Sequence, residues 1–350
     1  MVIIITISMV SLFSLSSCKT TAVATTEVAT TEAATTEAAT TEAAETPATK
    51  ALRIHFQTGD KLSEWATTAW AGAEKAAKED GNTTITHNAS ETGAVDENVS
   101  IAEQAIAAKY DGIIMMTNAA EAYEEPLKKA KAAGIPSVAF FRAPLKDTVA
   151  VGYAGPDALA YASNAAVWLG TKMGGKGIVL VEQAGTSDKD KGIFEEFNNK
   201  MKEQYPDIKV LQENCSLDPA VLISKVTSVI QKNPGINGFW GCSASYAVLT
   251  AKVCEDQGIL NKVTILGNAV LKTNLDELKL GRIQGIIDEG NYTAGYICVK
   301  MLINYIRTGK TGYDFAYIIP TSIVESSNVG DYQTIIDETA ALLESRGLLK

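Results

Sequence analysis

A chain of 350 residues, of which 46% are hydrophobic, is long enough to fold into two domains with separate cores. Its formal net charge of −10 argues against nucleic acid as a partner, because the acidic residues are dispersed along the whole chain. The two histidines, His55 and His87, both fall in strand-like runs. No spacing of histidine and cysteine fits zinc or haem, so we expect no metal and no cofactor.

The first segment, residues 1–17, has the layout of a secretory signal peptide. Its apolar stretch from Val2 to Leu15 is too short to cross a bilayer and ends in small residues. The tetrad Leu15-Ser16-Ser17-Cys18 resembles a bacterial lipobox, which implies that Cys18 becomes a lipid-carrying N-terminus. A generic secretory signal with an incidental cysteine is the alternative, and the lack of Lys or Arg before the apolar run suggests an upstream start. We expect an exported protein, anchored by lipid to the cell membrane and facing the periplasm or the cell exterior.

Residues 18–50 read as a low-complexity tether. Thr25-Thr26-Glu27-Val28-Ala29 is followed by three copies of Thr-Thr-Glu-Ala-Ala that end at Ala44. A period of five matches neither a helix face nor a strand, and these side chains offer almost nothing to bury. We expect an extended, flexible leash that holds a folded domain off a membrane surface.

From Leu52 on, short β-branched runs alternate with longer amphipathic runs, which predicts a parallel sheet with helices on its faces. The expected strands of the first half are Leu52–Phe56, Thr83–His87, Gly112–Met116 and Pro136–Phe141. The expected helices between them are Ser63–Glu79, Ala94–Lys109 and Ala119–Ala133. Gly81 and Gly134 stand where a left-handed residue would end a helix.

The alternation restarts after Asp157, which predicts a second sheet of the same kind. A helix over Asp157–Met173 leads to expected strands at Gly177–Glu182, Ile208–Glu213, Gly238–Gly241 and Val263–Gly267. Helices are expected between them at Asp188–Gln204, Pro219–Gln231 and Ser243–Gln257. Two such sheets predict two similar lobes with a cleft between them, and in open α/β sheets a ligand lies beyond the carboxyl ends of the strands.

Sequence motifs of enzymes are absent or misplaced. The run Gly170–Gly177 resembles a phosphate-binding loop, but Gly177 stands where a Ser or Thr would bind magnesium, and the run follows a helix instead of a strand. No Gly-x-Gly-x-x-Gly follows the first strand, and no Gly-x-Ser-x-Gly is present. We therefore expect a binding protein with no catalytic residue.

Four cysteines follow Cys18, and none of them forms a Cys-x-x-Cys pair. We expect them to be small buried apolar residues, with a disulfide between Cys242 and Cys254 as the alternative in an exported protein. They are Cys215, Cys242, Cys254 and Cys298.

Several stretches of the chain carry a family resemblance. They are Trp65 with Gly72-Ala73-Glu74-Lys75-Ala76-Ala77, Tyr110-Asp111-Gly112-Ile113-Ile114, Ala133-Gly134-Ile135-Pro136, Val151-Gly152-Tyr153-Ala154-Gly155-Pro156-Asp157 and Leu280-Gly281-Arg282-Ile283. In these stretches the chain resembles the type 1 periplasmic binding proteins, in the ribose-binding branch of the solute-binding proteins of ABC transporters. The resemblance extends from Leu52 to about Val329.

The resemblance implies an α/β clamshell, in which two doubly wound parallel-sheet lobes are joined by three hinge segments. The hinges would fall near Gly152–Gly155, Ile287–Asn291 and Ile319–Ser322. The N-terminal lobe would comprise residues 51–152 and 290–318. The C-terminal lobe would comprise residues 153–289 and 319–350, with a final helix near Asp331–Ser345. We expect a monomer.

The resemblance also implies a ligand site, in which this sequence departs from the sugar-binding pattern. Members that bind pentoses or hexoses usually have Asp-Arg after the fourth strand, whereas this chain has Phe141-Arg142. It has Cys242-Ser243 and Asn268-Ala269 where members often have Asn-Asp or Asp-Ala and Phe-Asp. Aromatic faces that stack on sugar C–H groups remain, while part of the polar set is missing or moved. The expected ligand-binding residues are Gln57, Asp60, Trp65, Asn118, Phe141, Arg142, Asp188, Lys189, Trp240, Ser243, Asn268 and Glu289.

Several of these residues have a second interpretation. Trp65 could cover the sheet, Trp240 could lie in the core, and Glu289 could orient the hinge backbone instead of touching a ligand. Asp188 and Lys189 could serve only as the solvated first turn of a helix.

Two functions remain open at this point. The first is capture of a small polar solute, a sugar or polyol, and its delivery to the membrane permease of an ABC importer. The alternative is sensing, in which the same clamshell carries an autoinducer-type furanosyl signal or reports a sugar to a membrane receptor kinase. The exported leader and the lack of a helical DNA-binding headpiece argue against a transcriptional repressor.

Overall fold

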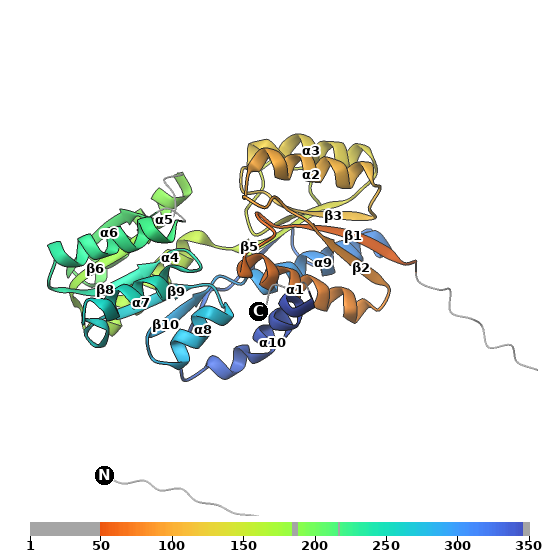
Figure 1. The fold of residues 1–350 in the computed structure, drawn as a ribbon. Helices are drawn as coiled ribbons and strands as arrows, with labels where there is room; N and C mark the ends of the chain where they lie inside the picture. Colours follow the sequence, from red (N-terminus) through yellow and green to blue (C-terminus); the bar gives the residue numbers. More distant parts are fainter. Residues whose placement is uncertain (1–49, 184–187, 216–217, 346–350) are drawn as a thin grey trace, which may run out of the picture. The chain divides into compact units, whose positions relative to one another are not determined.

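The structure, a computed structural model, describes residues 50–183, 188–215 and 218–345. Strands and helices alternate along this part of the chain and build two six-stranded sheets, each covered by helices on both faces (Figure 1). Residues 1–49, which contain the expected signal peptide, Cys18 and nearly all of the expected tether, lie outside the described residues. Among the residues that are described, no helix has both the length and the apolar character needed to span a membrane.

The first lobe contains a sheet of six parallel strands in the order β11-β5-β4-β3-β1-β2. These strands are β1 (Leu52–Gln57), β2 (Thr83–His87), β3 (Gly112–Met116), β4 (Ser137–Phe140), β5 (Gly152–Pro156) and β11 (Ala316–Ile319). Its helices are α1 (Glu64–Asp80), α2 (Val95–Ala107), α3 (Ala120–Ala132) and α9 (Asn291–Thr308). Helices α1 and α9 pack together on one face of the sheet, and α2 and α3 cover the other (Figure 1).

The second lobe repeats this plan, with a sheet in the order β12-β10-β9-β8-β6-β7. Its strands are β6 (Lys176–Gln183), β7 (Asp207–Asn214), β8 (Ile236–Gly241), β9 (Thr264–Asn268), β10 (Gly285–Asp288) and the short antiparallel β12 (Ser322–Val324). Its helices are α4 (Ala158–Lys172), α5 (Asp188–Gln204), α6 (Pro219–Lys232), α7 (Tyr246–Asp256), α8 (Lys272–Lys279) and a short turn at Leu260–Lys262. Helices α4 and α5 bury their apolar sides against one face of the sheet, and α6 and α7 against the other.

Helix α1 sits unusually close to α9, and this contact positions the edge of the cleft. A Cβ atom added at Gly72 would lie 2.0 Å from the carbonyl oxygen of Tyr292, and one added at Gly295 would lie 2.0 Å from that of Ala69. Only glycine allows the two backbones to approach this closely. Ser63 caps the first turn of α1 by accepting a hydrogen bond from the backbone N–H of Ala66. The start of α1 is therefore held rigidly at the end of the first sheet.

The chain crosses between the lobes three times, and the positions differ slightly from those expected. Strand β5 pairs with β4 and β11 as far as Pro156, so the first crossing follows Pro156 instead of Gly152. The expected boundary after residue 152 would cut this strand. The other two crossings are Glu289–Gly290 and Pro320–Thr321, each within the expected hinge segment.

The final helix, α10 (Gln333–Ser345), contacts both lobes, whereas the sequence suggested that it belongs to the second. Its residue Ile336 is part of the second lobe's core. Two residues later, Glu338 accepts a hydrogen bond from the hydroxyl of Tyr292 and pairs with Lys75 at 3.4 Å, both in the first lobe. The helix also packs against α1, where the buried side chain of Thr339 contacts that of Thr68.

The four cysteines after Cys18 are free thiols in the structure, so the alternative of a disulfide between Cys242 and Cys254 is not found. Cys215, Cys254 and Cys298 are buried, and burial raises the pKa of each thiol. Cys242 is half-buried at the end of β8, and burial raises the pKa of its thiol as well. All four therefore act as small apolar side chains instead of nucleophiles.

Candidate functional site

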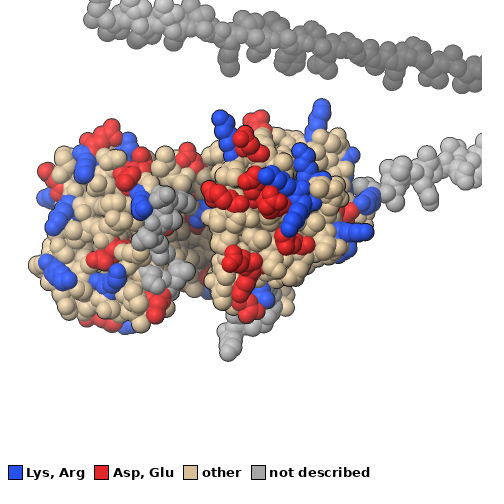
Figure 2. Space-filling view, turned by 90° about the horizontal axis from the view of Figure 1, so that it is seen from above, with Lys and Arg blue, Asp and Glu red and all other residues tan. Residues whose placement is uncertain are grey.

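A cavity of about 510 Å³ lies between the two lobes. The segments that line it follow the carboxyl ends of strands β1, β3, β4, β8, β9 and β10, which is where open parallel sheets place their ligands. Figure 2 looks onto the furrow between the lobes and shows acidic and basic side chains interspersed on both. The lining residues are Gly59, Asp60, Ser63, Glu64, Trp65, Met116, Phe141, Arg142, Cys242, Ser243, Ala244, Ser245, Asn268, Leu271, Thr273 and Glu289.

One wall of the cavity is aromatic. Trp65, in the first turn of α1, meets the ring of Phe141 edge-on, with 4.8 Å between ring centroids and an angle of 80°. The guanidinium of Arg142 lies 4.9 Å from the centroid of the same ring. Phe141 has a φ of 62°, a left-handed conformation that costs a bulky residue free energy and persists only where neighbours enforce it. Its backbone N–H donates to the carbonyl of Ala154 at 2.7 Å, which fixes this wall in place.

A chain of hydrogen bonds joins this wall to the second lobe through the crossing at Glu289. The indole N–H of Trp65 donates to Oε1 of Glu289 at 2.7 Å, and the amide of Asn268 donates to the same oxygen at 3.3 Å. Tyr161, on α4, donates its hydroxyl to Oδ1 of Asn268 at 2.6 Å. Burial raises the pKa of Tyr161 well above its ordinary value, so this hydroxyl remains a donor. The network ties one residue of each lobe to the crossing between them.

The charged side chains of the cavity differ in what they already bind. Asp60 accepts hydrogen bonds from the backbone N–H groups of Leu62 and Ser63 and from the hydroxyl of Ser63, so it shapes the loop before α1. Glu64 accepts hydrogen bonds from Lys272 and Thr273 at the start of α8. By contrast, no hydrogen bond or ion pair of the Arg142 guanidinium is found within the described part of the chain. Its five N–H donors are available to a ligand.

The structure brings most of the predicted site residues together at this cavity. Those that line it are Asp60, Trp65, Phe141, Arg142, Ser243, Asn268 and Glu289. The side chains of the predicted pair Asp188 and Lys189, at the first turn of α5, lie outside the described residues.

Three predicted residues lie elsewhere. Gln57 is fully buried and donates its side-chain amide to the carbonyl of Asn98 at 2.6 Å, so it fastens α2 to the first sheet. Trp240 is also fully buried, with its ring stacked on Phe197 at 4.8 Å, and belongs to the core of the second lobe. Asn118 is exposed on the loop after β3 and does not line the cavity. We leave these three out of the candidate site.

Sequence reasoning missed part of the second lobe's contribution. Leu271 and Thr273 line the cavity from the start of α8, a helix that was not expected. A signal for it exists, since Leu271, Leu275 and Leu278 are buried at helical spacing. Glu64 was also missed, although it directly precedes Trp65, because its partners lie more than 200 positions away.

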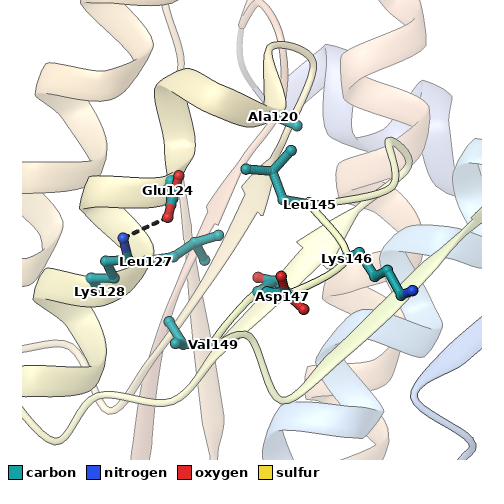
Figure 3. A pocket seen from close by; sticks show the side chains of 9 residues that line it. Ala120, Glu124, Leu127, Lys128, Leu145, Lys146, Asp147 and Val149 are labelled. Carbon is teal, nitrogen blue, oxygen red and sulfur yellow. Dashed lines mark hydrogen bonds and ion pairs between the residues drawn. The ribbon is translucent and has the colours of Figure 1, made fainter.

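A second cavity, of about 410 Å³, lies on the first lobe between α3 and the segment that follows Arg142 (Figure 3). Leu127, Leu145 and Val149 form its apolar part, and an ion pair between Glu124 and Lys128, one turn apart on α3, flanks it. This cavity draws on one lobe alone and has no aromatic wall. It is therefore not the site between the lobes.

Comparison with known proteins agrees with this geometry. The profile of the periplasmic binding protein domain family matches residues 57–311. A D-apiose import binding protein of Actinobacillus succinogenes is 24% identical over 260 residues, which cover 73% of this chain and 83% of that protein. A periplasmic solute-binding protein of an ABC transporter from Actinobacillus succinogenes, solved with bound D-allose, has a TM-score of 0.72 and 22% identity over 80% of this chain and all of its own.

A further solved structure shows the same fold. It is an ABC transporter solute-binding protein from Agrobacterium vitis with bound α-D-tagatopyranose, with a TM-score of 0.72 and 22% identity over 81% of this chain and 99% of its own. The two-lobed α/β fold that the sequence resemblance implied is thus confirmed.

Proposed function

Because the chain belongs to the periplasmic binding protein family, we propose that it is the solute-binding component of an ABC importer. In this proposal it captures a sugar or polyol between its two lobes and delivers it to a membrane permease. The observation that carries the proposal is the cavity between the lobes, where an aromatic wall faces a set of polar side chains. The volume of about 510 Å³ lies in the range of small-molecule sites.

The chemistry of the lining suits a polyhydroxylated ligand with one apolar face. The rings of Trp65 and Phe141 can cover the C–H face of a sugar. Arg142 offers donors to hydroxyl oxygens, while Ser243 and Asn268 supply short polar groups from the second lobe. The sugars named for the similar proteins, D-apiose, D-allose and α-D-tagatopyranose, support a sugar as the ligand here.

Capture would proceed by closure of the lobes about the three crossings. A ligand that contacts residues of both lobes binds the closed form more strongly, and this differential affinity shifts the population toward closure. Glu289 lies at one crossing and holds Trp65 of the first lobe and Asn268 of the second. Glu289 therefore connects the hinge between the lobes with the aromatic wall of the cavity.

The placement of the protein follows from its N-terminus. We propose that residues 1–17 are removed, that Cys18 carries the lipid, and that the repetitive segment after it gives the domain reach toward the permease. The protein would act as a monomer on the outer side of the membrane. Mass spectrometry of the membrane-extracted protein tests this, since a Cys18→Ala variant should lose both the lipid mass and membrane retention.

A thermal-shift screen over pentoses, hexoses, polyols and furanosyl compounds tests the ligand class. We expect at least one of these compounds to raise the melting temperature. Trp65→Ala should then weaken its binding about 30-fold, because removal of a central aromatic contact costs ~2 kcal/mol. Trp168→Ala is the matched control, since the Trp168 indole donates to Glu325 outside the cavity. A screen with no shift, or equal affinities for both variants, would refute the proposal.

A further inference from the structure

Helix α8, at the edge of the cavity, begins without a cap from its own sequence. Its N-cap residue is Leu271, whose side chain cannot accept a hydrogen bond, and no side-chain cap is formed there. Leucine is among the residues least suited to this position, since the first backbone N–H groups of a helix need an acceptor. The carboxylate of Asp276, one turn further on, pairs with the side chain of Lys272 at 2.6 Å.

The missing acceptor comes from the other lobe. The carboxylate of Glu64 accepts a hydrogen bond from the backbone N–H of Lys272 and a second one, at 3.0 Å, from the hydroxyl of Thr273. Glu64 lies in the first turn of α1, 208 positions earlier in the chain than Lys272. Both of its oxygens are used, one by each donor. The carboxylate thus satisfies the first backbone N–H of the helix, which has no partner within the helix, and places a negative charge at its N-terminus.

From this geometry we infer that Glu64 is a latch that closes the two lobes by capping α8 across the cleft. The inference rests on the proposed function in one respect, namely that the lobes open and close around a ligand. When they separate, Glu64 leaves with the first lobe and the first turn of α8 loses its acceptor. Closure alone restores the cap, so the cap adds to the stability of the closed form.

The latch also couples to the ligand wall. Glu64 is followed directly by Trp65, whose indole reaches the crossing at Glu289. The same turn of α1 therefore contacts α8 on one side of the cavity and the hinge on the other. Glu64 is a positioning residue, which sets the balance of open and closed forms for whichever solute the cavity accepts.

The test uses the ligand-free protein, so that its outcome does not depend on the identity of the solute. In Glu64→Ala, amide hydrogen exchange of the segment 270–276 should rise about fivefold, the effect of losing an N-cap. The radius of gyration from small-angle X-ray scattering should increase as the open form gains population. Glu121→Ala is the matched control, because Glu121 is an exposed carboxylate in the first turn of α3 in the same lobe.

Two further variants separate the latch from a general effect on α1. Thr273→Val removes one of the two hydrogen bonds from the side of α8, and its effect should not add to that of Glu64→Ala. Glu64→Gln keeps an acceptor oxygen and should recover part of the protection. Unchanged exchange and radius in Glu64→Ala, or full additivity with Thr273→Val, would overturn the latch. If Glu64→Ala leaves exchange and radius unchanged while the protein still binds a sugar, the latch fails and the proposed function stands. If exchange and radius change as expected while no sugar binds, the proposed function fails and the latch stands.

Discussion

The buried carboxyl group of Glu182 gives the sharpest prediction for stability. It lies at the end of β6 with no exposed surface, and its hydrogen bonds within the described residues come from the hydroxyl of Thr250, at 2.8 and 2.9 Å to its two oxygens. Burial raises its pKa from 4.5 to about 8, although the hydrogen bond from Thr250 acts in the opposite direction. The folded protein therefore favours the protonated form.

The sign of the pH dependence follows from this. Below pH 4.5 the carboxyl group is neutral in both the folded and the unfolded chain, so it does not change the free energy of unfolding with pH. Between pH 4.5 and about 8 the unfolded chain releases the proton while the folded chain keeps it, so the free energy of unfolding falls as the pH rises. The interval between these two values corresponds to a loss of up to ~5 kcal/mol, complete above pH 8. That is a large part of the stability of an ordinary domain.

Glu182→Gln removes this loss, because the amide cannot ionise and its oxygen still accepts from Thr250. Urea unfolding at pH 5, 7 and 9, followed by tryptophan fluorescence, should show near-equal stabilities of variant and wild type at pH 5. The variant should be the more stable form by several kcal/mol at pH 9. Glu203→Gln, which changes an exposed carboxylate, is the matched control and should show a constant difference. A difference between Glu182→Gln and wild type that does not change with pH would refute the reasoning.

Three further predictions concern the contact of α1 with α9 and the crossing at Asp288 and Glu289. Gly295→Ala places a methyl group 2.0 Å from the carbonyl oxygen of Ala69, so it should lower the free energy of unfolding by ~3 kcal/mol, measured in urea. An unchanged free energy of unfolding would contradict the close packing of α1 and α9. Glu289→Ala leaves the indole N–H of Trp65 without its acceptor and should weaken sugar binding about tenfold by calorimetry, whereas an unchanged affinity would place the network outside the binding event. Burial raises the pKa of Asp288 from 3.8 to about 6, so the free energy of unfolding falls as the pH rises through this range. In urea unfolding, Asp288→Asn should therefore gain ~3 kcal/mol over wild type between about pH 4 and pH 7. An equal difference between variant and wild type at both pH values would contradict this.

Long periodic helices and the central strands of both sheets were predictable from the sequence, whereas two short elements of the second lobe were not. The helix expected at Ser63–Glu79 is found at Glu64–Asp80, and the one expected at Asp188–Gln204 has the same bounds in the structure. By contrast, α8, with eight residues, and β10, with four, were not expected, and the helical spacing of the leucines in α8 extends over only about two turns. Only the last two residues of β10 fell within the hinge segment that the family resemblance implied near Ile287–Asn291.

The site was predictable as a location but not side chain by side chain. The rule that ligands lie beyond the carboxyl ends of strands selects the loops that line the cavity between the lobes, yet it does not say which face of the sheet a terminal side chain meets. Gln57 is the last residue of β1 and turns toward α2, and Trp240 turns toward α5 in the same way. Gln57 was expected in the cleft, and Trp240 was left open between cleft and core, because only their position along the strand could be read from the sequence. Their packing partners are set by the other elements of the sheet.

The contacts that matter most for function join residues that no local pattern connects. Glu64 and Trp65 are neighbours in the chain, yet one contacts the start of α8 and the other the crossing at Glu289. Since the contact of Glu64 with α8 spans the lobes, the free energy of closure depends on a side chain outside the aromatic ligand wall. Measured affinity then combines the intrinsic affinity of the closed form with the fraction of protein that is closed before binding. A variant at Glu64 should therefore change the affinities for all solutes by a common factor, whereas a variant at Phe141 should change them selectively.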